Sequence, residues 1–270
     1  MSSFLFLALV ALFFLGTAIG SFLNVLIYRT VREESWIKGR SKCDHCQKQI
    51  GWYDNIPILS FLLLRGKSRC CQKPIPISYP LVELMTGSLF AWWYGIGFVF
   101  FRLTTTPLQV LQPLFWLLVG IILLTIFFAD LKHMIIPDLA VVSLFVLTVG
   151  YRLYLVASGI MQVRDLEHAL LAMMISTLFL GSLWALTKGK GMGLGDVKLM
   201  APIALLLGWP KTLVGIFLAF VLGGVVGVIL LMIGNKKIGQ VIPFGPFMIA
   251  GSIISLVWGD LIFNWYVFWL

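Results

Sequence analysis

A succession of long apolar segments constrains the fold of this chain more than any other feature of its sequence. A helix that crosses about 30 Å of hydrocarbon needs roughly 20 mostly apolar residues. Of the 270 residues, 60% are hydrophobic and only 11% are charged, whereas a soluble domain carries about 25% charged residues. The sequence therefore predicts an all-α polytopic membrane protein with about eight transmembrane helices. The expected spans are residues 4–27, 81–101, 113–130, 138–157, 169–187, 197–210, 212–234 and 247–268.

The first span is expected to stay in the protein as a membrane anchor. No basic residue precedes it, and about 25 uncharged positions lead up to Arg29, which is too long for the core of a signal peptide. Residues 28–80 form the one sizeable polar piece of the chain. We therefore divide the chain into a first transmembrane helix at 1–27, a cytoplasmic cysteine-containing domain at 28–80 and a transmembrane core at 81–270.

The basic residues indicate the orientation of the chain, since cytoplasmic loops collect Lys and Arg. With the amino terminus outside, sixteen basic residues fall on the cytoplasmic side and four on the other side. The sixteen are Arg29, Arg32, Lys38, Arg40, Lys42, Lys48, Arg65, Lys67, Arg69, Lys73, Lys132, Lys188, Lys190, Lys198, Lys236 and Lys237, and the four are Arg102, Arg152, Arg164 and Lys211. The net charge of +9 thus belongs mainly to one membrane face. Membrane lipid, and not nucleic acid, is the expected partner of this charge.

Segment 28–80 contains the pattern of a small zinc knuckle, with Cys43 and Cys46 followed by the adjacent Cys70 and Cys71. A reducing cytoplasm disfavours disulfides, so thiolate ligands to a metal are one interpretation and unligated thiols in a packed loop are the other. The first pair, Cys-x-x-Cys, forms half of a tetrahedral site. Adjacent side chains diverge, so we expect one of Cys70 and Cys71 to bind zinc, with His45 or both cysteines completing a strained set.

Three aspartates lie where expected spans meet the cytoplasm: Asp130, Asp138 and Asp196. Carboxylates are costly in a membrane protein unless they are used or paired. Asp138 follows Pro137 and suits the first turn of a helix, where a carboxylate complements the positive end of the helix dipole. Asp130 ends a span, where the dipole end is negative, so no capping role is expected for it.

Asp196 stands near a helix start behind the alternating glycines Gly191, Gly193 and Gly195. Capping alone would explain the carboxylate, but glycines permit positive φ and let another backbone, such as a substrate chain, approach closely. Two carboxylates within a few ångströms share a proton and together activate water, which is the chemistry of an aspartic protease. The same pair could bind a cation or relay protons in a transporter, and a membrane scaffold is a third alternative.

The sequence lacks the motifs of other classes of intramembrane protease. The three histidines form no HExxH motif, and no Gly-x-Ser-x-Gly elbow occurs, which disfavours zinc and serine intramembrane proteases. Asp260 lies toward the outer end of the last span, so we expect it to be too far from Asp130 to act with it. Repeated broken helices in two related halves, which are typical of transporters, are not evident in the sequence.

Several ordered motifs make the chain resemble the bacterial type IV prepilin peptidases of pilus and type II secretion systems. They run almost from end to end: "GSFLNVLIYR" at 20–29, "CDHC" at 43–46, "NIPILSFLLLRGK" at 55–67, "YPLVE" at 79–83, "DLKHMIIPD" at 130–138, "GMGLGDVKLM" at 191–200 and "PFGPF" at 243–247. In that family the catalytic aspartates are the first of D-x6-P-D and the one in G-x-G-D. The resemblance thus implies Asp130 and Asp196 as the catalytic pair.

The resemblance also implies the substrate, a prepilin or pseudopilin whose short basic leader ends in glycine before an apolar helix. Cleavage is expected at the cytoplasmic face of the bacterial inner membrane, with no cofactor for the peptidase step. Members with the long first cytoplasmic loop also methylate the new amino terminus with S-adenosylmethionine, so a second, methyltransferase activity is expected. The residues expected to support the two aspartates are Gly193, Gly195, Asp138, Lys198, Pro243 and Gly245.

The residues of methyl transfer are less well defined, since no Gly-x-Gly-x-x-Gly fingerprint is present. Glu83 suits an acid that holds the incoming amine, and a structural partner for a nearby Lys or Arg is the alternative. Asn24 and Arg29 are candidates for contact with cofactor or substrate, although snorkelling explains Arg29 equally well.

The chain departs from the family pattern at one position. Bacterial relatives usually carry two Cys-x-x-Cys pairs in this loop, and the second pair would fall on positions 68 and 71. Position 68 is Ser68 and Cys70 is extra, so Cys71 matches and the remaining zinc ligand is open.

Two further stretches carry structural expectations. Gly16 and Gly20 have the spacing that lets transmembrane helices approach closely. In "PFGPF", Pro243, Gly245 and Pro246 interrupt a backbone that lipid cannot satisfy, so this stretch is expected to face protein or a cavity adjoining Asp196.

Overall fold

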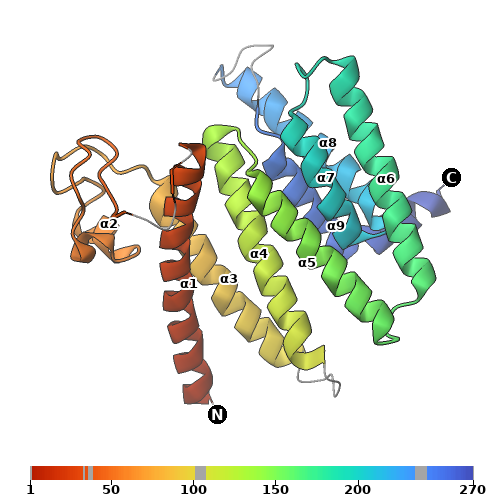
Figure 1. The fold of residues 1–270 in the computed structure, drawn as a ribbon, viewed down its shortest axis with the longest axis horizontal. Coiled ribbons are helices and arrows are strands. Elements are labelled where there is room, and N and C mark those ends of the chain that lie inside the picture. The colour runs from red at the N-terminus through yellow and green to blue at the C-terminus, as the bar shows by residue number, and fades with distance from the viewer. Residues whose placement is uncertain (1, 33, 36–38, 101–107, 235–241, 270) are drawn as a thin grey trace. The chain divides into compact units, whose positions relative to one another are not determined.

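The computed structural model describes residues 2–32, 34–35, 39–100, 108–234 and 242–269 (Figure 1). Among these residues the regular secondary structure is helical, and the polar segment adds two isolated β-bridges. The predicted all-α fold class is therefore confirmed. The chain divides into two compact units, residues 1–128 and 129–270. Four of the basic residues used to orient the chain, Lys38, Arg102, Lys236 and Lys237, lie outside the described residues.

The helices follow the predicted spans closely. In chain order they are α1 (Ser2–Val31), the 3-10 helix η1 (Trp52–Asn55), α2 (Leu59–Leu63), α3 (Ser78–Phe100), α4 (Leu108–His133), α5 (Asp138–Ala157), α6 (Val163–Leu186), α7 (Leu194–Leu207), α8 (Lys211–Met232) and α9 (Gly245–Phe268).

Six of the described helices are long and apolar enough to cross a membrane. They lie at Ser3–Val31, Leu111–His133, Asp138–Ala157, Val163–Leu186, Lys211–Met232 and Gly245–Phe268. The chain is therefore a multi-pass membrane protein. The other two expected spans are also helices, but α7 has only 14 residues. At 1.5 Å per residue it is about 21 Å long, shorter than the hydrocarbon layer.

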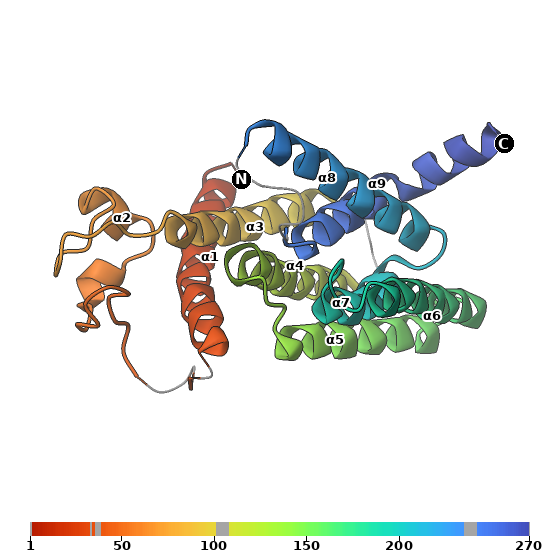
Figure 2. The same cartoon turned by 90° about the horizontal axis from the view of Figure 1, so that it is seen from above.

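In the first unit, α1 and α3 pack closely through glycines, and they lie side by side in both views (Figures 1 and 2). A Cβ atom added to Gly16 would lie 2.8 Å from the Cα of Gly87, and one added to Gly20 would lie 2.7 Å from the Cα of Glu83. Only a glycine fits where backbones approach this closely. The expectation that Gly16 and Gly20 serve helix packing is confirmed.

The polar segment of the first unit is anchored to the end of α1 by Arg29. Its guanidinium donates hydrogen bonds to the carbonyl oxygens of Ser35 and Gly39, at 3.0 and 3.1 Å. The side chain is buried. Arg29 therefore has a structural role in fixing the chain as it leaves the helix, and this explains its burial better than snorkelling does.

The second unit is arranged around the short helix α7, which lies beside α5 and α6 (Figure 2). Its buried residues include Leu199, Ile203 and Leu205. The carbonyl oxygen of Leu205, near the end of the helix, accepts a hydrogen bond of 2.6 Å from the guanidinium of Arg152 in α5. A helix end inside a membrane protein needs such a donor, because lipid offers none. Arg152 thus fixes the carboxy-terminal end of the short helix.

Candidate active site and metal centre

Asp130 lies in the last turn of α4 and is 5% exposed. Its Oδ2 accepts a hydrogen bond of 2.9 Å from the backbone N–H of Gly245, which begins α9. A Cβ atom added to Gly245 would lie 2.6 Å from the same oxygen. The glycine therefore lets the start of α9 approach the carboxylate directly.

This contact corrects two expectations from the sequence. Asp130 does have a capping role, because its carboxylate meets the amino-terminal end of α9, where free N–H groups and the helix dipole favour negative charge. The "PFGPF" stretch is confirmed as facing protein, but its Gly245 adjoins Asp130. Pro246 lies in the first turn of α9, where Pro is favoured, and Pro243 precedes the helix.

Asp196 lies in the first turn of α7 and is 6% exposed. Its Oδ2 accepts a hydrogen bond of 3.1 Å from the N–H of Gly193. Asp196 precedes the expected span 197–210 and lies outside the six long apolar helices. Burial, together with the charge of Asp130, raises the pKa of its carboxyl to about 6, against the lowering effect of the Gly193 N–H. The fold thus brings the two predicted aspartates close enough for their charges to interact.

The glycines before Asp196 act through space and not through unusual backbone angles. Gly191, Gly193 and Gly195 are absent from the described residues with positive φ, so the positive φ that glycine permits is not used here. A Cβ atom added to Gly195 would lie 3.1 Å from the Cβ of Ile136, and one added to Gly193 would lie 3.2 Å from Oδ2 of Asp196. The glycines therefore let the start of α7 pack tightly beside the chain that follows Asp130.

The other acidic candidates have basic partners. Asp138 begins α5 as predicted, and its carboxylate pairs with the ammonium of Lys198 in α7 at 2.8 Å. Both side chains are well exposed. Asp260 pairs with Lys211 at 3.0 Å, and it is not among the groups that shift the pKa of Asp196. These pairs explain the two acids without a catalytic role.

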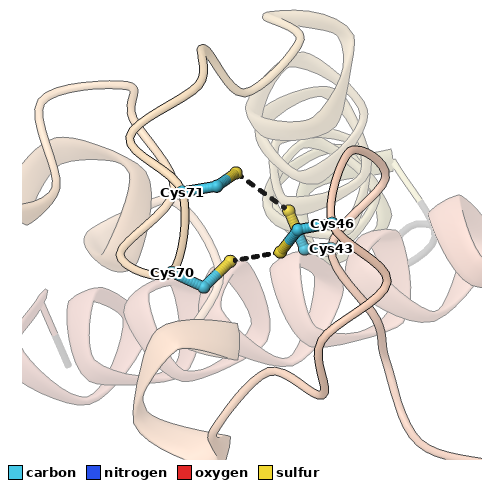
Figure 3. Close-up of side chains that lie close together, drawn as sticks. All are labelled: Cys43, Cys46, Cys70 and Cys71. Carbon is cyan, nitrogen blue, oxygen red and sulfur yellow. Dashed lines mark hydrogen bonds between the residues drawn. The ribbon is translucent and has the colours of Figure 1, made fainter.

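The four cysteines of the polar segment form one cluster, with their side chains pointing toward one another from two turns (Figure 3). The sulfur atoms of Cys43 and Cys71 lie 3.7 Å apart, and those of Cys46 and Cys70 lie 3.1 Å apart. All four sulfurs lie within 4.8 Å of one another. Both adjacent cysteines therefore join the cluster, whereas His45 does not and has Nε2 3.4 Å from the carbonyl oxygen of Pro74.

The thiols of this cluster have unequal acidity. Burial raises the pKa of Cys43, but hydrogen bonds from the backbone N–H groups of Cys46 and His45 and from neighbouring thiols outweigh it and lower the pKa to about 6. The hydrogen bond to Cys46 raises the pKa of Cys70 to about 12. One readily formed thiolate beside a retained proton is expected where sulfurs crowd together without a cation to share their charge.

The donor set fits a zinc ion. Four thiolates at a Zn–S distance of about 2.3 Å in a tetrahedron have sulfurs about 3.8 Å apart. The observed separations of 3.1 and 3.7 Å lie near this value. The residues that would hold the ion are Cys43, Cys46, Cys70 and Cys71.

The first unit also contains a cavity of about 520 Å³ between α1, the start of α3 and the polar segment. Its lining includes all three residues suggested for methyl transfer, Asn24, Arg29 and Glu83. The Asn24 amide donates a hydrogen bond of 3.0 Å to the carbonyl oxygen of Tyr79, and Arg29 donates to that of Ser35. Both side chains therefore use hydrogen-bond donors in contacts with the backbone. The volume lies in the range of small-molecule sites.

Among the lining residues, Glu83 is the candidate for binding a ligand. It is 8% exposed, and its carboxylate accepts a hydrogen bond of 2.7 Å from the N–H of Ile58. Within the described ranges no Lys or Arg forms a salt bridge with it, so the structural alternative of a basic partner is not seen there. A buried carboxylate that faces a cavity without a cationic partner is a candidate for binding a cation.

The chain matches two family models. Residues 14–96 match the Bacterial Peptidase A24 N-terminal domain, and residues 117–228 match the Type IV leader peptidase family. The first match covers α1 from residue 14 onward, the cysteine cluster and most of α3, and the second covers both buried aspartates.

Curated relatives resemble the chain over nearly its whole length. A protein of Legionella pneumophila is 34% identical, with 94% of this chain and 92% of the relative covered. One of Aeromonas hydrophila is 35% identical, with 97% and 94% covered, and one of Pseudomonas aeruginosa is 32% identical, with 94% and 91% covered. Each of these proteins is named prepilin leader peptidase/N-methyltransferase. No solved structure matches the chain.

Proposed function

The chain belongs to the type IV leader peptidase family, and on this premise we propose that it is a bifunctional membrane enzyme acting on prepilins or pseudopilins. In the first reaction it removes the basic leader after its last glycine, as an aspartic endopeptidase. In the second it methylates the new amino terminus with S-adenosylmethionine. The names of the relatives support both activities, and no comparison favours a transporter or a scaffold.

The observation that carries the peptidase proposal is the pair of buried carboxylates, Asp130 and Asp196, each held by one backbone N–H. Two such groups do not both ionise easily, so the pair carries one proton. Gly245 and Gly193 each occupy an Oδ2 oxygen and fix the orientation of the carboxylates. The remaining oxygens are available to a water molecule and to the substrate.

In the proposed hydrolysis, the ionised carboxylate takes a proton from water while the water oxygen bonds to the carbonyl carbon of the glycine. The protonated carboxyl donates its proton to the carbonyl oxygen. The C–N bond then breaks, and its nitrogen takes from the first carboxyl the proton that came from water. A hydroxyl of the tetrahedral carbon returns its proton to the second carboxyl as the C=O bond forms again. The leader leaves with a new carboxyl group, the mature chain has a free amine, and the pair again holds one proton.

We place this site at the cytoplasmic face of a bacterial inner membrane. The distribution of basic residues supports that orientation, and the substrate's basic leader would be held on the same side. Asp130, Asp196 and the start of α9 all lie at helix ends, which is where a segment emerging from the membrane becomes accessible.

For the second reaction, the cavity beside Glu83 supplies the site. When bound, S-adenosylmethionine would provide a methyl group on a positively charged sulfur. Glu83 would hold the ammonium form of the acceptor's amino terminus and take its proton before the nitrogen attacks. The supporting observation is the burial of the Glu83 carboxylate at the cavity wall without a basic partner among the described residues. Asn24 and Arg29 are proposed to shape this cavity through their backbone contacts.

We also propose that the cysteine cluster binds zinc as a structural ion. It would tie together the two cysteine-bearing turns of the polar segment. On this proposal, residues 28–80 serve methylation together with the adjoining helices, residues 1–27 anchor them, and residues 81–270 contain the peptidase.

Incubation of the purified chain with a prepilin and S-adenosylmethionine tests the function. The mass of the product should fall by the leader and rise by about 14 Da, the mass that one methyl group adds. An unchanged prepilin would contradict the peptidase, and a cleaved but unmodified product would contradict the methyltransferase. Glu83→Gln keeps an acceptor for the Ile58 N–H, so it is expected to lower methylation at least tenfold and cleavage less than twofold, and equal methylation would remove Glu83 from the reaction.

A further inference from the structure

The two cysteine-bearing turns repeat one another with a spacing of 25 residues. Lys42-Cys-Asp-His-Cys-Gln-Lys48 aligns with Lys67-Ser-Arg-Cys-Cys-Gln-Lys73. Each turn is closed by an isolated antiparallel bridge, Lys42 with Gln49 in the first and Lys67 with Pro74 in the second. The repeat therefore extends from the sequence to the backbone.

The backbone hydrogen bonds of the two turns match one for one. The N–H of Cys43 donates to the Lys48 carbonyl, and the N–H of Ser68 donates to the Lys73 carbonyl, both at 2.9 Å. The N–H of Gln47 likewise donates to the Cys43 carbonyl, and the N–H of Gln72 donates to the Ser68 carbonyl. Gln47 and Gln72 both have positive φ, at 58° and 56°. The two turns are thus two copies of one backbone turn.

The repeat defines which side chains are equivalent. Cys46 corresponds to Cys71, and Cys43 corresponds to Ser68, so the second turn has a hydroxyl where the first has its leading thiol. The extra cysteine, Cys70, corresponds to His45. If ligands followed the repeat strictly, the site would have three sulfurs and one serine oxygen.

The side chains do not follow the repeat at these two positions. The sulfur of Cys70 lies 3.1 Å from that of Cys46 and within the four-sulfur cluster, whereas the equivalent His45 is outside it. The hydroxyl of Ser68 lies 3.0 Å from the sulfur of Cys71, within hydrogen-bond distance.

We propose that Cys70 supplies the fourth sulfur of the zinc site in place of Ser68, and that Ser68 supports the site by a hydrogen bond to Cys71. This inference rests on the zinc binding proposed above and specifies its ligands. The ion would then have four thiolates, of which Cys46 and Cys71 occupy equivalent positions of the repeat while Cys43 and Cys70 do not. Such hydrogen bonds to metal ligands typically change affinity by about 10- to 100-fold.

The test exchanges the ligand between the two positions in the full-length chain purified in detergent. Zinc content is measured by elemental analysis, and Co²⁺ substitution reports the number of sulfur ligands through its absorption spectrum. The unaltered chain should hold about one zinc and give the spectrum of tetrahedral four-sulfur cobalt. Cys70→Ser should lower the affinity at least 100-fold and reduce the sulfur-to-cobalt absorption.

The double variant Ser68→Cys, Cys70→Ser moves the sulfur to the position that the repeat predicts. It should restore the four-sulfur spectrum and bring the affinity to within about tenfold of the unaltered chain. Ser68→Ala should keep the spectrum and weaken the affinity about 10- to 100-fold. His45→Gln is the matched control at the position equivalent to Cys70, and it should change neither quantity. Helix content and monodispersity confirm that each variant is folded.

The results separate this inference from the zinc proposal beneath it. An unaltered chain without zinc or cobalt binding would overturn the zinc site itself, as would a loss of two free thiols to a disulfide between Cys46 and Cys70. A four-sulfur spectrum that persists in Cys70→Ser would overturn the assignment of Cys70. A folded double variant that fails to regain the spectrum would overturn the equivalence of position 68 with Cys43.

Discussion

The cysteine cluster and the aspartate pair are built in opposite ways. The cluster is local, since its four ligands lie between Cys43 and Cys71 and are presented by two copies of one turn. The aspartate site joins helix ends from distant parts of the second unit, and the Asp130 carboxylate is held by a residue 115 positions along the chain. A local site can lose or shift one ligand and keep its frame, as at Ser68 and Cys70. The aspartate site depends on how the ends of three helices, α4, α7 and α9, pack, so small changes in packing should lower its activity most.

The largest expected effect comes from removing either carboxyl group. Asp130→Asn and Asp196→Asn should each lower the kcat of prepilin cleavage by at least about 1,000-fold, because the loss of one member of a catalytic unit removes nearly all its contribution. The amide oxygen still accepts the Gly245 or Gly193 N–H, so the fold should persist. Cleavage is measured by product mass in membranes, and turnover within tenfold of the unaltered chain would exclude the substituted residue.

A somewhat smaller effect is expected from crowding Asp130. In Gly245→Ala the new methyl group would lie 2.6 Å from the Asp130 carboxylate and displace it, so we expect cleavage to fall about 10- to 100-fold, since small misplacements cost about that much. Gly224→Ala is the matched control, because a Cβ atom there meets nothing within 4 Å. Similar rates for the two variants would show that the contact with Gly245 does not position the carboxylate.

Breaking the cysteine cluster should affect the two activities unequally. We expect Cys43→Ser combined with Cys46→Ser to lower methylation at least tenfold and cleavage by a smaller factor, because the cluster lies in the first unit and the aspartates lie in the second. Both activities are read from one mass spectrum of the product. An equal loss of both would show that the cluster stabilises the whole protein and does not serve one reaction.

The raised pKa of Asp196 predicts a gain in stability when its charge is removed. An acid with a pKa of about 6 in the folded protein, above its unfolded value of about 3.9, destabilises the fold once it ionises. The cost is full above pH 6 and disappears as the pH falls toward 4. Asp196→Asn should therefore raise the melting temperature by about 2–5 °C at pH 8 and leave it unchanged near pH 4. A lower melting temperature at pH 8 would show that the carboxylate mainly stabilises the helix start.

The smallest effect is expected at the ion pair between Asp138 and Lys198. Both side chains are exposed, and exposed pairs contribute about 0–1 kcal/mol. Asp138→Asn should change cleavage by less than about fivefold, and exchanging the two charges should restore it. A loss of more than 100-fold in Asp138→Asn that the exchange does not repair would give Asp138 a role beyond the ion pair.

The features that the sequence predicted well are those carried by local pattern. Apolar segments gave the helices, Pro137 and Asp138 marked the start of α5, and the spacing of Gly16 and Gly20 predicted the close approach of α1 and α3. The motifs also identified the aspartates that the fold brings together. Each of these signals depends on a few neighbouring residues.

The features that it missed depend on where the chain returns in space. The cap that Asp130 provides to α9 comes from the far end of the sequence, although Pro246 beside Gly245 was a signal for a helix start. The adjacent cysteines were expected to diverge, but the turn around them directs both sulfurs into one cluster. The repeat of the two Cys-Gln-Lys stretches indicates from this chain's own residues what the family resemblance had implied, that Ser68 takes the place of a thiol.

On the proposed function, hydrolysis belongs to the aspartates and methylation to a separate site in the first unit. The most direct measurement gives Asp196→Asn two substrates: an intact prepilin, and a synthetic mature segment whose amino terminus is already free. We predict no loss of the leader from the prepilin and a gain of about 14 Da, one methyl group, on the segment. Removal of the leader by this variant, or failure to methylate a segment that the unaltered chain methylates, would contradict the claim.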